Sequence, residues 1–266
     1  MKNKLRAATF AAAVTIAAAA SPALAQGEAG SFGIAIQGGG SFAIGGTMHD
    51  GVNAPVANLG PLNSDLAGVP ATLQIERRSQ NDVYDTAWTL GGELSYALTD
   101  SSEVLLGVNY TEANGNLINV GGAAVGAPVN ATLPVFGDFG KYKALAIEAG
   151  YRQYFGTGGG ITPFVTAKAG ATRISAIAAD FAVPDGDITL SNVAFSKGSW
   201  AFSGGLDLGV SIPLGERASL APEVGIHYTG GAKGDDTVLG GLGLGVINDK
   251  GERWSVPVRV RLKFSL

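Results

Sequence analysis

The stretch Val258-Arg-Val-Arg-Leu-Lys-Phe-Ser-Leu266 decides the fold, because its side chains alternate strictly between apolar and polar types. Successive residues of a β-strand point to opposite faces. One face would therefore be apolar, with Val258, Val260, Leu262, Phe264 and Leu266. The other would be cationic, with Arg259, Arg261 and Lys263. A soluble sheet could bury one such strand on a core, so the interpretation depends on whether the pattern recurs.

The alternation recurs in seven further runs along the chain. These predict strands near 32–44, 84–98, 103–111, 145–155, 161–173, 200–212 and 220–229. Three short connections (99–102, 156–160 and 213–217) alternate with four long ones (about 45–83, 112–140, 174–198 and 230–252). Bacterial outer-membrane barrels have even strand numbers, short periplasmic turns and long extracellular loops. The sequence therefore predicts an all-β fold, an antiparallel transmembrane up-and-down barrel of eight strands.

A barrel of ten or twelve strands is the alternative. Thr72 to Arg78 alternates, and Phe181 to Val193 contains a hairpin-like Pro-Asp-Gly-Asp. We favour extensions above the bilayer, because Glu76, Arg77 and Arg78 are consecutive and one charge would face lipid. An arginine there costs roughly 2–4 kcal/mol near the midplane.

The N-terminus predicts export. Three basic residues precede an Ala-rich run, and an Ala-x-Ala site ends at Ala25, which is typical of a signal peptide over residues 1–25. The barrel domain is then 26–266, with four long extracellular loops and the cell outer membrane as its location. It keeps 15 Lys and Arg against 22 Asp and Glu, a net charge of −7 that argues against nucleic acid as a partner. The chain has no cysteine, which excludes disulfides and thiolate metal sites.

Taken together, the signal peptide, eight amphipathic runs and terminal strand resemble the small outer-membrane barrel superfamily, in particular the opacity-type and OmpA-like eight-stranded barrels. The resemblance implies contact with outer-membrane lipid and lipopolysaccharide. It also implies recognition of the terminal strand, Val258, Val260, Leu262, Phe264 and Leu266, by the barrel-assembly machinery. The usual terminal aromatic is replaced here by Leu266, and the aromatic is displaced to Phe264.

The inward faces of the predicted strands carry five acidic and five basic residues. An eight-stranded barrel is just wide enough for side chains to fill it, so these charges must pair across the lumen. The predicted lumen ion-pair network is Glu93, Glu103, Glu148, Arg152, Lys168, Asp207, Glu223, Arg259, Arg261 and Lys263. A network of salt bridges would close the barrel, whereas a gated or narrow ion path through the same charges is the alternative.

Aromatic residues near the strand ends predict interfacial girdles. The girdle residues are Tyr84, Trp88, Tyr96, Trp200, Tyr228 and Trp254. His227 and Thr229 resemble part of the active site of lipid A deacylase barrels, but Thr229 stands where a serine is expected and His227 points inward. No catalytic, cofactor or metal site is predicted.

The loops are poor in charge and rich in Gly, Ala, Val, Asn and Pro. They would form a hydrated fringe if disordered, or a contact surface if paired into hairpins. Because loops on a rigid scaffold carry most binding, we expect a structural surface protein that supports the envelope and presents loops for adhesion or recognition of a host or cell-surface ligand. A small porin or narrow ion channel is the alternative, and a lipid A-modifying enzyme is the second.

Overall fold

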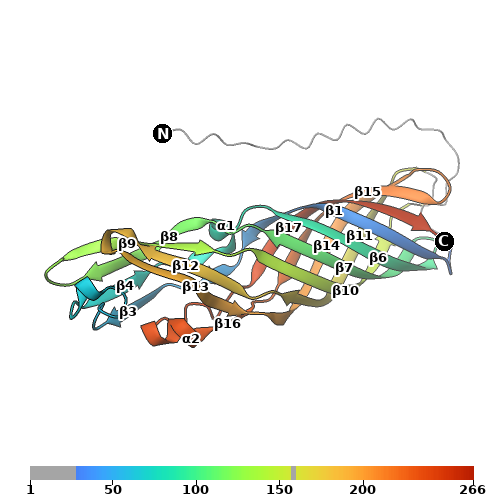
Figure 1. The fold of residues 1–266 in the computed structure, drawn as a ribbon. Helices are drawn as coiled ribbons and strands as arrows, with labels where there is room; N and C mark the ends of the chain where they lie inside the picture. Colours follow the sequence, from blue (N-terminus) through green and yellow to red (C-terminus); the bar gives the residue numbers. More distant parts are fainter. Residues whose placement is uncertain (1–27, 157–159) are drawn as a thin grey trace, which may run out of the picture.

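The structure is a computed structural model of the chain, and it describes residues 28–156 and 160–266. Within these residues, eight antiparallel strands pair in a closed ring in the order β1-β17-β15-β14-β11-β10-β7-β6 (Figure 1). The barrel strands are β1 (Phe32–Gly45), β6 (Ala87–Thr99), β7 (Ser102–Ala113), β10 (Tyr142–Tyr154), β11 (Thr162–Ile174), β14 (Ser199–Pro213), β15 (Ala218–Thr229) and β17 (Arg253–Ser265). The predicted eight-stranded all-β barrel is confirmed.

The first and last strands close the barrel. β1 and β17 pair in antiparallel register, with Ile34 opposite Phe264 and Gly38 opposite Val260. Beyond the ladder, the amide of Leu266 donates to the carbonyl oxygen of Phe32 at 2.8 Å. Closure leaves no unpaired edge in the barrel, which removes the usual template for edge-to-edge association.

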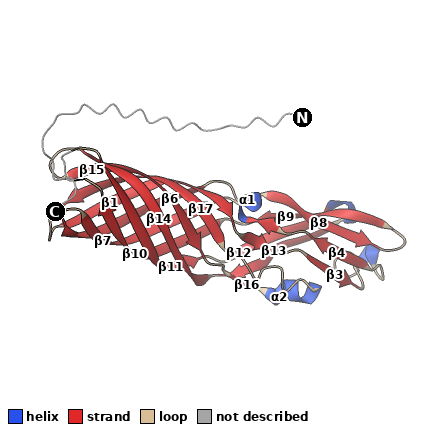
Figure 2. Cartoon of the chain, turned by 180° about the vertical axis from the view of Figure 1, so that it is seen from behind, coloured by secondary structure: helices blue, strands red, loops and turns tan. Residues whose placement is uncertain are grey.

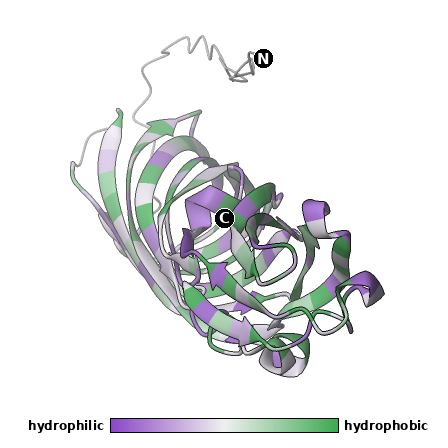
Figure 3. Ribbon diagram, turned by 90° about the vertical axis from the view of Figure 1, so that its left-hand side faces the viewer, coloured by the Kyte–Doolittle hydropathy of each residue, from purple (hydrophilic) through white to green (hydrophobic). Residues whose placement is uncertain are grey.

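The barrel wall is apolar outside and polar inside. Ile36 is 62% exposed on the outer face, whereas the neighbouring Gln37 is 3% exposed on the inner face. The alternation is visible as green and purple bands along the strands in Figure 3. Soluble monomers rarely expose an apolar surface as large as the outer face of this barrel, called here the outer belt. The outer belt is therefore suited to contact with lipid.

The four long connections extend beyond one end of the barrel and pair with each other (Figures 1 and 2). Their strands form one seven-stranded sheet in the order β16-β13-β12-β9-β8-β4-β3. These strands are β3 (Val52–Val56), β4 (Ala71–Ile75), β8 (Leu117–Val125), β9 (Ala131–Phe139), β12 (Ile177–Val183), β13 (Ile188–Lys197) and β16 (Lys233–Gly234). The loops are therefore neither a fringe nor separate hairpins but one module, called here the loop sheet.

Short elements complete the loop sheet. They are β2 (Thr47–His49), η1 (Ser64–Leu66), β5 (Arg78–Ser79), α1 (Gln80–Val83), η2 (Pro184–Gly186), α2 (Asp236–Leu239) and η3 (Gly240–Leu242). Figure 2 shows α2 beside the loop sheet, at the end of the molecule far from the C-terminus. One cluster of buried apolar residues runs from this sheet into the top of the barrel, and it includes Phe139, Tyr142 and Ile174.

The ten- or twelve-strand alternative is wrong. β4, β12 and β13 contain the extra alternating segments, and all three belong to the loop sheet. The charges after β4 are paired away from lipid, with Arg78 Nη2 lying 2.7 Å from Glu76 Oε2.

No helix in the described part of the chain is long and apolar enough to cross a membrane. The predicted signal peptide, residues 1–25, lies outside the described residues and stays a prediction. Residues 157–159 of the predicted turn at 156–160 also lie outside them.

Candidate functional site: the lumen and the loop sheet

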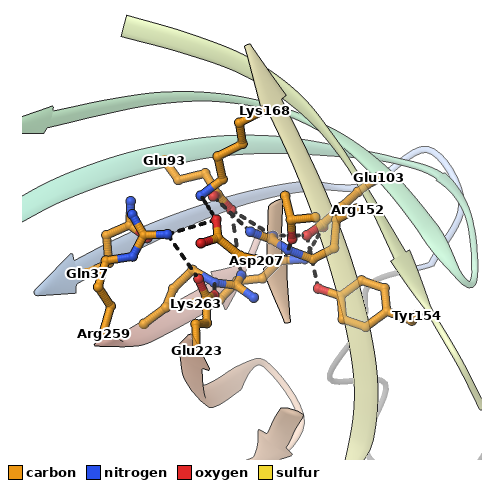
Figure 4. A network of polar contacts seen from close by, with 12 residues as sticks. Gln37, Glu93, Glu103, Arg152, Tyr154, Lys168, Asp207, Glu223, Arg259 and Lys263 are labelled. Atoms are coloured by element: carbon orange, nitrogen blue, oxygen red, sulfur yellow. Dashed lines mark hydrogen bonds and ion pairs between the residues drawn. The ribbon is translucent and has the colours of Figure 1, made fainter. Parts of the chain in front are cut away.

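Arg152, on β10, is the centre of the lumen network. Its guanidinium binds Glu93 on β6 through two hydrogen bonds, Nη1 to Oε1 at 2.8 Å and Nη2 to Oε2 at 2.9 Å. The same Nη1 also contacts Glu103 on β7, and Nε donates to Thr166 Oγ1 on β11 at 2.9 Å. Four strands are thereby joined through one side chain that is 0% exposed (Figure 4).

The C-terminal strand supplies the other cations of the network. Arg261 donates through Nε to Glu223 Oε1 at 2.6 Å. Lys263 Nζ pairs with Glu103, whose other oxygen accepts from the Tyr154 hydroxyl at 2.9 Å. Glu223 lies on β15, the neighbour of β17, whereas Glu103 lies on β7, so Lys263 connects the last strand to a strand that is not adjacent to it in the ring.

Asp207, on β14, is a second centre. Its Oδ2 lies 2.8 Å from Arg259 Nη2 and 3.1 Å from Lys168 Nζ, and its Oδ1 lies 2.8 Å from His227 Nε2. The carboxylate therefore faces one imidazole and two cations, and Figure 4 shows the two cations, Lys168 and Arg259, beside Asp207. The pairs with Arg259 and Lys168 are buried, so removing either cation or the carboxylate would leave an uncompensated charge in the lumen.

One predicted member lies outside the ion pairs. Glu148 is buried in the lumen, but among the described residues its carboxylate has no cation within ion-pair distance, and it accepts a hydrogen bond from Ser203 Oγ at 2.8 Å. Its inclusion in the ion-pair network was wrong, because a hydroxyl on β14 is the group that its strand position brings into reach.

The sequence reasoning missed Arg253, the first residue of β17. It is 3% exposed, its guanidinium carbon lies 5.0 Å from the centre of the Tyr142 ring, and Nη1 and Nη2 have no hydrogen-bond partner among the described residues. Arg253, Glu148 and His227 line a polar cavity above the network. The odd-numbered pattern of Arg259, Arg261 and Lys263 extends back to Arg253 and was the available signal.

Most of the predicted girdle lies on the outer surface of the barrel. Trp88, Tyr96, Trp200 and Trp254 are exposed, and half-buried Tyr228 packs its ring 5.0 Å from that of Trp254. Trp88, Trp200, Tyr228 and Trp254 stand at the loop ends of their strands, and Tyr96 at the turn end.

Tyr84 is the exception and a correction. It is 4% exposed and packs its ring 5.9 Å from that of Tyr142 in the apolar cluster. The helical turn α1, which begins after a capping box between Ser79 and Asp82, delays the start of β6 to Ala87. Tyr84 therefore precedes the strand and faces inward.

The loop sheet encloses an apolar chamber. Its lining comes from all four long connections: His49, Leu59, Leu62, Leu66, Leu73, Ile75, Val120, Ala123, Val125, Leu133, Val135, Phe139, Phe181, Ala182, Val183, Ile188, Leu190, Phe195, Leu239, Leu244 and Ile247. The cavity among these side chains has a volume of about 70 Å³. The interiors of the two parts therefore differ in polarity: charged and polar side chains fill the lumen of the barrel, whereas apolar side chains line the chamber of the loop sheet.

A closed eight-stranded barrel with an apolar outer belt, aromatic strand ends and a polar lumen defines a small outer-membrane β-barrel protein.

No protein-family model matches the chain, and no curated protein matches its sequence. Among solved structures, it is similar to Neisserial surface protein A, with 13% identity and a TM-score of 0.42 over 88% of this chain and 97% of that one. It is also similar to OprG from Pseudomonas aeruginosa, with 17% identity and a TM-score of 0.38 over 90% and 98%. A third is Ail of Yersinia pestis, with 12% identity and a TM-score of 0.38 over 89% and 99%.

Proposed function

We propose that the protein is a non-conducting outer-membrane scaffold that holds a folded recognition module outside the cell and supports the envelope. The observation that carries this proposal is the contrast between its two parts. The lumen is crossed by buried ion pairs around Arg152 and Asp207, whereas the loops converge on one sheet with its own apolar core. Binding belongs on the module, because it is the part that can meet ligands outside the membrane.

The lumen chemistry argues against both alternatives from the sequence. Ion conduction requires a continuous water-filled path, and Arg152, Asp207 and Glu223 are each at most 3% exposed. A lipid-modifying enzyme needs its nucleophile at the lipid-facing surface, but His227 points into the lumen toward Asp207. We therefore assign no catalytic role to His227 or Thr229.

Single-channel recording tests the closed lumen. The refolded protein should give no steady conductance in a planar bilayer. A variant with both centres neutralised, Arg152→Met with Asp207→Asn, serves as the comparison in which any latent path would open. Reproducible conductance steps in the unmodified protein would overturn the scaffold proposal in favour of a channel.

A further inference from the structure

Four exposed cations gather where the loop sheet meets the barrel. They are Lys143, Arg173, Lys197 and Lys233, called here the basic rim. They come from β10, β11, β13 and β16, so segments far apart in the sequence contribute to one surface. Figures 1 and 2 show β16 at this junction. Among the described residues, none of the four lies within ion-pair distance of an acid.

Two lysines of the basic rim face each other directly. Lys197 on β13 and Lys233 on β16 are opposite residues of an antiparallel pair, an arrangement in which like charges repel. The Asp235 carboxylate lies near Lys197, but it accepts hydrogen bonds from the Thr237 amide at 3.1 Å and from the Thr237 hydroxyl at 2.5 Å. The pair therefore needs a negative group that the described residues do not supply.

Arg173 connects this pair to Lys143. The guanidinium of Arg173 lies beside Gly198, the residue after Lys197, since a Cβ atom on Gly198 would meet Arg173 Nη2 at 3.1 Å. Leu145 on β10 is directly opposite Arg173, so Lys143, two positions before Leu145, is the diagonal neighbour of Arg173 on the same face. The four cations thus form one continuous surface.

The other exposed lysines at this end of the barrel have acidic partners. Lys141 Nζ lies 2.8 Å from Glu112 Oε1, and Lys250 Nζ lies 3.2 Å from Asp50 Oδ2. Glu112 is the residue opposite Lys143, and its pairing with Lys141 leaves Lys143 without an ion pair. The basic rim differs from these lysines because it faces outward without a carboxylate.

The position of Arg173 sets the level of the basic rim relative to lipid. Its two cross-strand partners are Leu145 and Trp200, which are 40% and 55% exposed in the outer belt. Tryptophan side chains mark the boundary between hydrocarbon and headgroups. An arginine at this level lays its stem along apolar surface and extends its charge toward the polar side. The basic rim therefore meets the layer in which lipid phosphates lie.

We propose that the basic rim binds the phosphate groups of lipid A, the membrane anchor of lipopolysaccharide. This inference rests on the proposed function, which places this end of the barrel in the outer leaflet. A phosphate monoester carries a charge of about −1.5 to −2 at pH 7, so the two phosphates of lipid A together match the four cations. Arg173 offers a planar fork for phosphate oxygens, and the three lysines act as point charges. A phospholipid with a single phosphodiester would neutralise the surface less completely.

The test uses diphosphoryl lipid A as the probe. The protein, folded in a non-ionic detergent, is titrated with this lipid, and native mass spectrometry counts the lipid molecules that stay bound. Monophosphoryl lipid A and phosphatidylglycerol are the comparators, because they keep the apolar chains but carry less charge. The unmodified protein should bind diphosphoryl lipid A saturably, and monophosphoryl lipid A roughly tenfold more weakly.

Variants locate the site. Lys197→Gln with Lys233→Gln should weaken the binding of diphosphoryl lipid A about 30-fold, because each cation near an anionic membrane surface contributes roughly fivefold. Arg217→Gln with Lys250→Gln is the matched control. It removes the same charge from exposed positions outside the basic rim, one of them in the turn at the opposite end of the barrel, and should leave binding unchanged. Heat-modifiable gel mobility confirms that both double variants are folded.

Three results would overturn the inference: no retained diphosphoryl lipid A, equal affinity for either comparator lipid, or equal losses in the two double variants. Single-channel recording of the same preparations tests the scaffold proposal separately. A silent barrel that retains no lipid A would reject only this inference, whereas a conducting barrel that binds lipid A at the basic rim would reject only the scaffold proposal.

Discussion

The guanidinium of Arg152 and the carboxylate of Glu93 form a two-point contact across the lumen, with N–O distances of 2.8 and 2.9 Å. Both side chains are at most 1% exposed. Bidentate pairs fix geometry as well as charge, and this one also holds Arg152 over the Phe164 ring at 5.3 Å. The contact joins β10 to β6, which are not neighbours in the ring, so it braces the barrel across its lumen.

Replacing Arg261 by methionine should destabilise the barrel much more than the same replacement of Arg253. Arg261→Met leaves Glu223 without its closest cation and should destabilise the barrel by about 3–5 kcal/mol. Arg253→Met removes a buried charge that has no carboxylate partner and loses only its contact with Tyr142, roughly 0.5–2 kcal/mol. Urea unfolding followed by heat-modifiable gel mobility measures both. Equal losses would mean that the lumen charges do not act as pairs.

On the apolar outer surface of the barrel, a charged side chain should destabilise the protein more the closer it lies to the middle of the bilayer. Leu206 is 53% exposed near the middle of β14, and Leu206→Arg should cost about 2–4 kcal/mol of barrel stability in a bilayer. Leu214→Arg makes the same change in the short turn after β14 and should cost about 0–1 kcal/mol. Equilibrium folding into lipid vesicles measures the loss of folding free energy in each variant. Similar losses in the two variants would mean that Leu206 does not face the interior of the bilayer.

Gly39 should contribute to the stability of barrel closure, because it lets β1 approach β17 closely. A Cβ atom there would lie 2.1 Å from the carbonyl oxygen of Val258 on β17, so Gly39→Ala forces the two strands apart. Overpacking of this kind destabilises by about 1–3 kcal/mol. The adjacent Gly40 is the control, because an added Cβ meets its nearest atom at 3.7 Å. A loss in Gly40→Ala as large as that in Gly39→Ala would contradict the register of β1 and β17.

The loop sheet should weaken in acid through His49. Burial and the nearby Arg78 lower the pKa of His49, whereas Asp50 opposes the shift. Above the ordinary value near 6.5 the ring is neutral whether folded or unfolded, so pH has no effect through this group. As the pH falls below 6.5, His49 is protonated in the unfolded loops but stays neutral in the folded sheet. The free energy of unfolding of the loop sheet then declines by at most 1.36 kcal/mol per pH unit.

Limited proteolysis of the loops at pH 7.5 and 5.5 measures this dependence, with His49→Phe as the control for other titrating groups. The unmodified protein should be cut faster at pH 5.5 by a larger factor than the variant. The same factor in both proteins would exclude His49 as the cause.

The alternation of apolar and polar side chains was sufficient to predict the barrel. Within each strand of about a dozen residues, this pattern distinguishes the face toward lipid from the face toward the lumen. The loop sheet could not be predicted in the same way, since pairing β9 with β12 joins segments about 40 residues apart and depends on barrel geometry. Phe181 to Val193 showed alternation without showing which segment would pair with it.

The site was predictable only as a set of inward charges. Individual partners depend on which strands face each other across the lumen, so Glu148 was wrongly included among the ion-paired residues and Arg253 was overlooked. His49 carried no signal, because a single histidine in a loop becomes informative only when Phe139 and Phe195 are seen beside it.

Amide hydrogen exchange of the loops tests the central claim most directly, that the loops form one folded module on a closed barrel. The account predicts that amides of β8, β9, β12 and β13 are protected and exchange together as one cooperative unit, while the 214–217 turn exchanges fast. Exchange of all four loops at the rate of an unstructured chain, with the barrel strands still protected, would contradict it.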